Sequence, residues 1–204
     1  LVVDVHAVGI NFRDVLNVLD MYPGDPGPPG GDCSGVVTLL HDISALAGSS
    51  SRAPVVGSSV FGLAPGSLGT QCTTIVDLVA PKPNTARYEE AAAVPTICST
   101  AQLLARHATH VSSSRSVLVH AGTGGVGMAA TCLLRQLDAH PFVTTASPHK
   151  RALARSSLSA QSSSNSRGTD FVEMCAVLTL GLGVGVVLNS LTSPGMLAAS
   201  FSTL

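Results

Sequence analysis

The chain is poor in aromatic and charged residues. Its 204 residues include no tryptophan, and aromatic residues make up 3% and charged residues 11%, whereas 45% are hydrophobic. This composition favours a substantial core and argues against disorder of the whole chain. The formal net charge is −1, so no basic excess exists to neutralise nucleic-acid phosphates or an anionic membrane surface. We therefore expect neither a nucleic acid nor a membrane as partner.

Long apolar runs and leader-like segments are also missing. No run approaches the roughly 18 residues that a membrane-spanning helix needs. The chain starts Leu-Val-Val-Asp, with no initiator Met, no basic segment and no long apolar segment, which does not fit a signal peptide. We expect a fragment that begins inside a strand of a longer protein.

Closely spaced cysteines are absent as well. The five cysteines are at least 26 residues apart along the chain: Cys33, Cys72, Cys98, Cys132 and Cys175. This spacing excludes a C-x-x-C zinc or redox pair and gives no disulfide framework. It indicates buried free thiols in a reducing compartment, and therefore a cytoplasmic location. His107 and His110 lie close in sequence, but no cysteine or carboxylate accompanies them, so we expect no metal site.

What the chain does have is a glycine-rich stretch between an apolar strand and a helix. The stretch from Ser116 to Ala130 reads S-V-L-V-H-A-G-T-G-G-V-G-M-A-A, and residues 117–119 are typical of a buried parallel strand. Gly122, Gly124 and Gly127 fit the G-x-G-x-x-G spacing, and residues 128–137 are apolar enough for a packed helix. Such glycines permit a sharp turn, the approach of a pyrophosphate and close packing of helix and strand. We predict dinucleotide binding; the alternative is a glycine-rich loop without a ligand.

The first ninety residues indicate a small β-rich domain. Strands are expected over 1–8, 33–40, 55–63 and 72–79, because apolar and polar residues alternate there between Gly/Pro turns. Residues 10–19 fit a short amphipathic helix, whose Asn11, Arg13 and Asp14 are alternatively capping or solvated residues. Residues 21–31 are rich in Pro and Gly and predict a loop.

The remainder predicts the start of a doubly wound α/β sheet. Helices are expected over 88–105, interrupted at Pro95, over 150–158 and from Thr169; strands are expected over 142–146 and 184–188. Residues 161–168 are rich in serine, which is typical of a flexible linker, yet they lie between one expected helix and the start of the next. A complete six-stranded sheet needs about 150 residues after its first strand, so only the first nucleotide-binding half plus one strand is present. The domain boundaries are predicted at 1–93 and 94–204.

Several strings point to one family. V-G-I-N-F-R-D-V-L-N-V-L-D-M-Y-P-G-D, G-G-D-C-S-G-V-V, V-L-V-H-A-G-T-G-G-V-G-M-A-A, T-A-S-P-H-K and V-V-L-N-S-L closely resemble the enoyl reductase domain of type I modular polyketide synthases. That family belongs to the quinone oxidoreductase branch of the medium-chain dehydrogenase/reductase superfamily. The resemblance implies an incomplete GroES-like β-rich domain followed by the first part of a Rossmann sheet.

The resemblance also implies an activity. It is the NADPH-dependent reduction of a 2,3-enoyl thioester carried on an acyl carrier protein, with hydride transfer to the β-carbon, beside neighbouring synthase domains. Two other functions stay open: a stand-alone zinc-independent quinone oxidoreductase, and a truncated fragment without catalysis.

The family's site residues carry over by position. The resemblance implies that the pyrophosphate is bound by Gly122, Gly124, Gly125, Val126 and Gly127. It places Ser147, Lys150 and Arg167 around the 2′-phosphate of NADPH and Asn189 near the nicotinamide ribose. It further implies that Asn11 faces the nicotinamide and substrate, and that Tyr22 stands over the α-carbon and sets α-methyl configuration.

Three departures from the wider pattern matter. Gly185 replaces a residue that is usually acidic in the family, and the family's proton-donating lysine and aspartate are expected beyond residue 204. Zinc-dependent members of the superfamily have a G-H-E histidine where this chain has Gly30-Gly31-Asp32, so a zinc-free protein is predicted.

The choice of cofactor also follows from the residues themselves. An NAD site usually has an Asp or Glu about twenty residues after the glycines, bonded to the ribose 2′-hydroxyl. Residues 143–148 read V-T-T-A-S-P and contain no acid, whereas Lys150 and Arg167 follow. Cations in place of a carboxylate favour a phosphate at that position, and hence NADPH.

Overall fold

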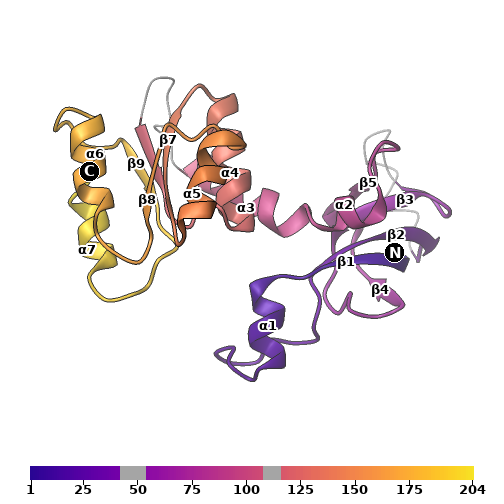
Figure 1. The fold of residues 1–204 in the computed structure, drawn as a ribbon. Coiled ribbons are helices and arrows are strands. Elements are labelled where there is room, and N and C mark those ends of the chain that lie inside the picture. Colours follow the sequence, from indigo (N-terminus) through magenta and orange to yellow (C-terminus); the bar gives the residue numbers. More distant parts are fainter. Residues whose placement is uncertain (42–53, 108–115) are drawn as a thin grey trace. The chain divides into compact units, whose positions relative to one another are not determined.

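The computed structural model describes residues 1–41, 54–107 and 116–204. The chain divides into two compact units, Leu1–Thr96 and Ile97–Leu204. Each unit has its own sheet and its own hydrophobic core (Figure 1). His110, named above as a metal candidate, lies outside the described residues.

The first unit is built on a five-stranded antiparallel sheet in the order β4-β1-β2-β3-β5. The strands are β1 (Val2–Gly9), β2 (Asp32–Leu39), β3 (Ser59–Leu63), β4 (Gln71–Thr73) and β5 (Val79–Pro81). Its helices are α1 (Phe12–Val18), the 3₁₀ helix η2 (Val76–Leu78) and α2 (Tyr88–Ala92). Val3, Val37 and Val60 are fully buried in its core. The GroES-like β-rich prediction is confirmed.

Two predicted strands of this unit are shorter than expected. Residues 72–79 were expected to form one strand, but β4 ends at Thr73 and η2 intervenes before β5. Just after β4, the Thr74 hydroxyl donates to the Leu63 carbonyl at 2.7 Å. The strand expected over 55–63 begins only at Ser59, since Gly57 has a φ of +88° in a preceding turn.

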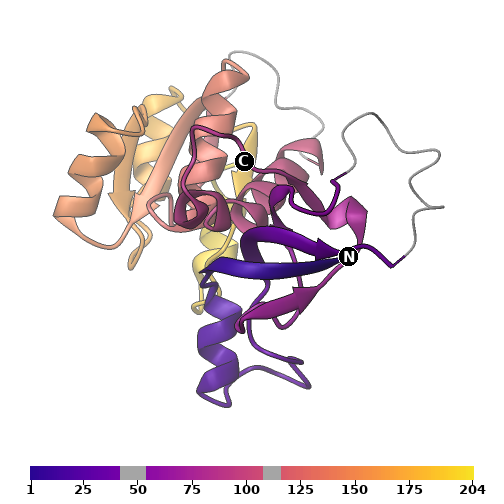
Figure 2. The ribbon, with the colours of Figure 1, turned by 90° about the vertical axis from the view of Figure 1, so that its right-hand side faces the viewer.

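Helix α1 buries a polar residue and exposes apolar ones, the opposite of what its amphipathic pattern leads one to expect. Its buried residue is Asp14, whereas Phe12 and Val18 are each 74% exposed. Both ribbon views show α1 extending away from the strands of its unit (Figures 1 and 2). The helix is therefore attached to the unit through its polar N-terminal turn and not through its apolar side chains.

The second unit contains a parallel sheet in the order β8-β7-β6-β9. The strands are β6 (Ser116–Val119), β7 (His140–Thr145), β8 (Ser162–Asn165) and β9 (Val186–Leu188). The helices are α3 (Pro95–His107), α4 (Gly125–Gln136), α5 (Pro148–Ser156), α6 (Phe171–Leu178) and α7 (Met196–Phe201). This is the first half of a Rossmann sheet plus one strand, as predicted.

Alternate residues of β6 face different helices. Val117 and Val119 pack in one core cluster with residues of α3, α4 and α5. Leu118 packs in another with residues of α6 and α7. The sheet is therefore covered on both faces (Figure 1), in keeping with the apolar run Val-Leu-Val in its central strand β6.

Three details of this unit correct the sequence interpretation. Helix α4 begins at Gly125 and not at Met128, so two of the glycines belong to its first turn. The serine-rich segment is not a linker, because residues 162–165 pair with β7. Pro95 begins α3, as its fixed φ and missing N–H allow at a first helical position. Among the helices of the described ranges, none has the length and apolar character to cross a membrane.

Candidate functional site

The glycine turn, by which we mean residues 121–127, joins β6 to the first turn of α4 at the carboxyl end of the sheet. The Gly122 N–H donates to the Thr144 carbonyl at 2.9 Å, and the Gly124 N–H donates to the Ala121 carbonyl at 2.8 Å. Ala121, and not a glycine, has the left-handed conformation of the turn, with a φ of +51°. The turn is therefore tied to the neighbouring strand β7 on one side and closed on itself on the other.

The glycines of the turn have two different roles. Gly122 and Gly127 are buried, and a Cβ on Gly127 would lie 2.3 Å from the Ala121 carbonyl oxygen. A Cβ on Gly122 would lie 2.6 Å from the Val143 Cβ. Gly124 and Gly125 are exposed, at the helix end whose N–H groups lack intrahelical partners. The first pair permits close packing, and the second pair leaves backbone open for a phosphate to approach.

Val126 lies half-buried in the first turn of α4. Its backbone N–H is one of the free N–H groups at the start of the helix. All five residues assigned above to the pyrophosphate thus lie in one turn and the first helical turn that follows it.

The residues expected at the 2′-phosphate lie at the same edge of the sheet. Thr145 of β7 pairs with Asn165 of β8, so Ser147 and Arg167 each follow a paired residue by two positions. Ser147 is the N-cap of α5, and its hydroxyl accepts from the Lys150 N–H at 3.3 Å. The Arg167 N–H donates to the Asn165 side chain at 3.1 Å. The structure thus brings Ser147, Lys150 and Arg167 to neighbouring strand ends, with no acidic residue in residues 140–150.

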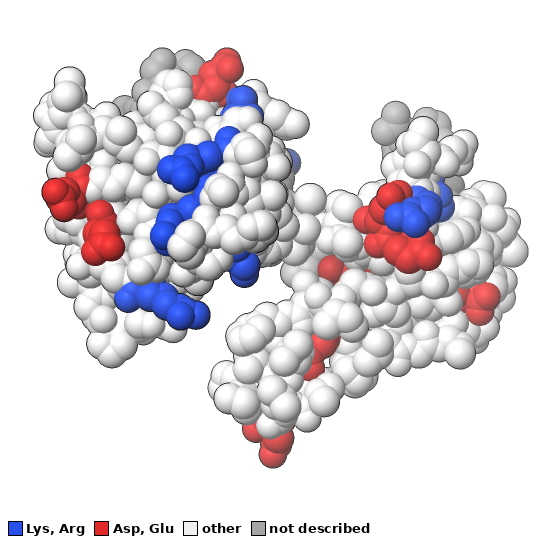
Figure 3. Space-filling model, viewed as in Figure 1, with Lys and Arg blue, Asp and Glu red and all other residues white. Residues whose placement is uncertain are grey.

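Basic residues gather around α5. His149, Lys150 and Arg151 occupy its first turn and Arg155 its last. In Figure 3 the blue surface of this unit is concentrated where α5 lies, and the red surface of Asp and Glu lies apart from it. Since Lys150 and Arg167 are exposed, their charges are available to an anionic ligand.

Asn189 directly follows β9, beside the strand end that precedes the glycine turn. Val119 of β6 pairs with Leu188, and the His120 N–H donates to the Leu188 carbonyl at 3.0 Å. The Asn189 side chain bonds with Leu191 at 3.1 and 3.2 Å. Asn189 therefore lies at the same edge of the sheet as the glycine turn, in an exposed loop that its own side chain closes.

In the first unit, Asn11 is held by a buried carboxylate. Its side-chain Nδ2 donates to Asp32 at 3.0 Å, and the same carboxylate accepts from the Thr96 hydroxyl at 2.6 Å and from the Thr96 N–H. Asp32 is 1% exposed. Because a carboxylate only accepts, the Asn11 amide nitrogen must face Asp32, and its Oδ1 is an acceptor for groups other than that carboxylate.

A second buried carboxylate fixes the start of α1. Asp14 accepts from the Asn11 N–H at 2.8 Å and from the Gly30 N–H at 2.9 Å. The residues Asn11 and Asp14 are thus neither merely solvated nor simple caps. Together with Asp32 they bind the start of α1 to the 21–31 loop and to the sheet.

Tyr22 lies half-buried in that loop. The Arg13 guanidinium carbon is 5.8 Å from the centre of its ring, and Arg13 also donates to the Pro26 carbonyl. Asn17 donates to the Gly27 carbonyl at 3.0 Å. Contacts from α1 therefore fix the loop that positions the phenol.

Sequence reasoning missed two residues. Asp32 was considered for what it replaces in a zinc site, whereas the structure shows it positioning Asn11. His120 was not singled out, although its side chain is 2% exposed and bonded at both ring nitrogens. A polar residue at the end of an apolar strand was the available signal. Within residues 1–41, 54–107 and 116–204, no three His, Cys, Asp or Glu side chains come together as a metal site requires.

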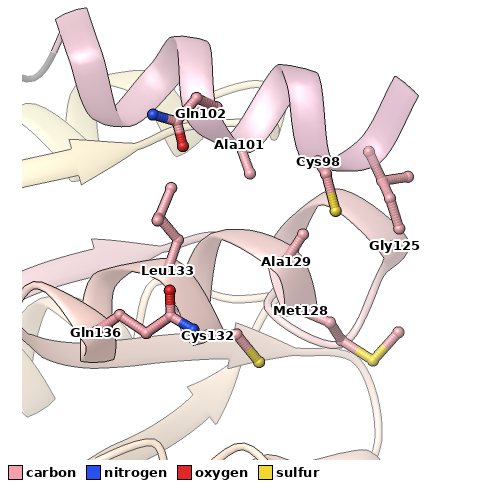
Figure 4. Close-up of a pocket in the computed structure, with 10 residues that line it drawn as sticks. Cys98, Ala101, Gln102, Gly125, Met128, Ala129, Cys132, Leu133 and Gln136 are labelled. Atoms are coloured by element: carbon pink, nitrogen blue, oxygen red, sulfur yellow. The ribbon is translucent and has the colours of Figure 1, made fainter. Parts of the chain in front are cut away.

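The second unit also has a pocket of about 420 Å³ between α3 and α4. Figure 4 shows Cys98 and Gln102 of α3 opposite Met128, Cys132 and Gln136 of α4. Partial desolvation beside α4, and then the nearby Cys132, raise the pKa of the Cys98 thiol, so it stays protonated at neutral pH and is a poor nucleophile. Cys98 and Cys132 are exposed, which corrects the expectation that every thiol is buried.

No family model matches the chain. Over 193 residues it is 39% identical to a phenolphthiocerol/phthiocerol polyketide synthase protein of Mycobacterium tuberculosis, an alignment that covers 93% of this chain and 8% of that protein. It superposes on the solved CurK enoyl reductase with a TM-score of 0.87 and 33% identity, over 100% of this chain and 62% of that one.

A mycobacterial protein solved in complex with NADPH, Rv1454c, gives a TM-score of 0.87 at 26% identity, over 100% of this chain and 62% of that one. The chain therefore spans less than two thirds of each of these solved structures and less than a tenth of the mycobacterial synthase.

Proposed function

We propose that this chain, which belongs to the enoyl reductases of polyketide synthases within the medium-chain dehydrogenase/reductase superfamily, binds NADPH and reduces a 2,3-enoyl thioester. The thioester is carried on an acyl carrier protein, and hydride reaches its β-carbon. Neighbouring synthase domains supply the substrate and take the product. Residues 94–204 are assigned to NADPH and residues 1–93 to substrate and catalysis.

The observation that supports NADPH most directly is the chemistry at the ends of β7 and β8. No acidic residue is present at the end of β7, and Ser147, Lys150 and Arg167 lie at adjacent strand ends. A ribose 2′-hydroxyl would find no carboxylate acceptor there, whereas a 2′-phosphate would find a hydroxyl and two cations.

The remaining cofactor contacts follow from the same edge of the sheet. The exposed Gly124 and Gly125 and the half-buried Val126 offer the N–H groups at the start of α4 to the pyrophosphate. Gly122 and Gly127 keep the turn close enough to do so. Asn189 is assigned to the nicotinamide ribose. When bound, NADPH supplies the hydride.

On the substrate side, Asn11 and Tyr22 are the residues that this chain contributes. Asp32 fixes the Asn11 amide in one orientation, so its carbonyl oxygen is a preorganised acceptor for the nicotinamide or the substrate. Tyr22 carries a hydroxyl able to deliver a proton to one face of the α-carbon, directly or through water.

A stand-alone quinone oxidoreductase is the second candidate, because a mycobacterial quinone oxidoreductase matches the fold with a TM-score of 0.85. Its identity to this chain is 26%, against 33% for the CurK enoyl reductase and 39% for the mycobacterial synthase. Turnover of an enoyl thioester but not of a quinone, by the domain that contains this chain, separates the two candidates.

The test of the proposed function is cofactor selectivity in the chain and in Lys150→Ala. Charge-assisted hydrogen bonds contribute about 1.5–3 kcal/mol each, so Lys150→Ala should weaken NADPH roughly tenfold or more and leave NADH nearly unchanged. Arg135→Ala is the matched control, since Arg135 is an exposed cation in the last turn of α4, away from the glycine turn. Equal affinity of the parent chain for NADH and NADPH, or an equal loss of both in Lys150→Ala, contradicts the assignment.

A further inference from the structure

A buried chain of hydrogen bonds leads from helix α7 to the glycine turn. His120 lies between the two, directly after β6 and directly before Ala121. Its Nε2 is 2.9 Å from the Ser200 hydroxyl, and its Nδ1 is 3.0 Å from the Thr144 hydroxyl. The three side chains are at most 3% exposed, so water does not compete for these bonds.

The direction of the bonds follows from the partners at each end. Among the described residues, the Thr144 hydroxyl oxygen has two partners, His120 Nδ1 and the Ala121 N–H at 3.3 Å. The Ala121 N–H only donates, so the hydroxyl hydrogen of Thr144 must point to Nδ1, which is therefore the unprotonated nitrogen.

The other end gives the same answer independently. The Ser200 hydroxyl donates its hydrogen to the Met196 carbonyl at 2.7 Å. Its oxygen can then only accept from His120 Nε2, which must carry the proton. Every donor in this series of hydrogen bonds has an acceptor only if the imidazole is the neutral Nε2–H form. Burial favours the same neutral form, because it lowers the pKa of His120 to about 4.

We propose that His120 is a positioning residue for the dinucleotide turn: in the neutral Nε2–H form it orients the Thr144 hydroxyl so that its oxygen accepts from the Ala121 N–H. Ala121 has a φ of +51°, a left-handed conformation that is unfavourable for a non-glycine residue. Its carbonyl accepts from the Gly124 N–H and lies against Gly127. The bond that the Ala121 N–H donates to Thr144 thus fixes Ala121, whose carbonyl in turn holds the Gly124 N–H. The effect on cofactor affinity rests on the proposed function; the protonation state of His120 does not.

The first experiment needs no cofactor. A long-range ¹H–¹⁵N spectrum of the chain at pH 7, with His120 assigned by its absence in His120→Gln, reports which ring nitrogen carries the proton. A proton on Nε2 supports the inference, and a proton on Nδ1 or on both nitrogens overturns it.

The second experiment measures NADPH affinity in Thr144→Val, Thr144→Ser and Thr131→Val. A net hydrogen bond corresponds to roughly three- to tenfold in an equilibrium, so Thr144→Val should weaken NADPH by that factor and Thr144→Ser should restore affinity to within about twofold. Thr131 is the control, because its equally buried hydroxyl donates inside α4 to the Gly127 carbonyl; Thr131→Val should bind like the parent.

The outcomes separate the two proposals. Parent-like affinity in Thr144→Val, with an unchanged melting temperature, overturns the positioning role. A parent chain that binds neither NADPH nor NADH contradicts the proposed function, and the spectrum then still decides the protonation state on which the inference depends.

Discussion

The substitution Gly127→Ala tests whether the glycine turn depends on close backbone packing. Gly127 lies in the first turn of α4, where helix propensity alone favours alanine over glycine by about 1 kcal/mol. Propensity therefore predicts that Gly127→Ala stabilises the protein. The packing around the residue predicts the opposite sign.

The free-energy cost of a Cβ at position 127 follows from its distances to neighbouring atoms. The added Cβ would lie 2.3 Å from the Ala121 carbonyl oxygen, 2.7 Å from the Gly122 Cα and 2.9 Å from the Gly122 carbonyl carbon. Real Cβ contacts are essentially never shorter than 3.0 Å, so the first contact must lengthen by at least 0.7 Å. All three atoms are backbone and cannot move aside as a flexible side chain would, so the overpacking cost should lie near the upper end of the usual range of about 1–3 kcal/mol. After the propensity gain, we expect a net loss of about 2 kcal/mol and a displaced turn.

The assay is thermal unfolding together with NADPH affinity. A loss of about 2 kcal/mol lowers the melting temperature of a chain of this size by about 4–8 °C. For the melting temperature, Gly125→Ala is the matched control in the same helix turn, because the nearest atom to its Cβ would be a side-chain methyl of Ile97, at 3.1 Å. A Gly127→Ala chain as stable as the parent, with unchanged NADPH affinity, would refute the reasoning.

Three further predictions concern protons, stereochemistry and metal. Because burial lowers the pKa of His120 from 6.5 to about 4, the unfolded chain binds a proton between these pH values that the folded chain does not. Because of this group, the free energy of unfolding should therefore fall by about 3 kcal/mol between about pH 7 and pH 4. Urea unfolding should show that this free energy depends less steeply on pH in His120→Gln than in the parent, and an identical pH dependence in the two would contradict the assignment. Tyr22→Phe, in the reductase domain that contains this chain and with an α-methyl substrate, should change the configuration at the α-carbon more than the rate of hydride transfer. Chiral analysis of the product checks this, and unchanged configuration with lost turnover would rule it out. The purified protein should contain no stoichiometric zinc, since Gly31 takes the place of the histidine and the neighbouring Asp32 is bonded to Asn11 and Thr96; zinc that survives mild chelation in elemental analysis would argue against this.

The sequence predicted the fold best around the glycine turn, where an apolar strand pattern is followed directly by glycines. The strand before the glycine turn and the helix after it were correctly placed, because a run of buried residues followed by glycines has few other structures. The boundary of α4 was wrong by three residues, since glycine is a poor helix former and the expected helix therefore started only after the last glycine.

The errors share a physical cause. Residues 162–165 lack the apolar pattern of a strand, and they form one because β7 offers unpaired backbone groups beside them. The side chains of α1 follow a helical pattern, but the pattern does not state which face is attached, and Asp14 rather than Phe12 is buried. The roles of Asp32 and His120 depend on partners 64 and 80 residues away in the chain, which no local spacing reveals.

The two edges of the parallel sheet have opposite consequences for handling the protein. β8 is Ser-Ser-Ser-Asn, and its polar side chains give a second chain little to pack against. β9 is Val-Val-Leu, half-buried, at the other end of the strand order. Unpaired backbone beside apolar side chains is a template for association with another strand. In a complete doubly wound sheet the next strand pairs along this edge, next to Asn189, so cofactor affinities are best measured in the reductase domain that contains this chain.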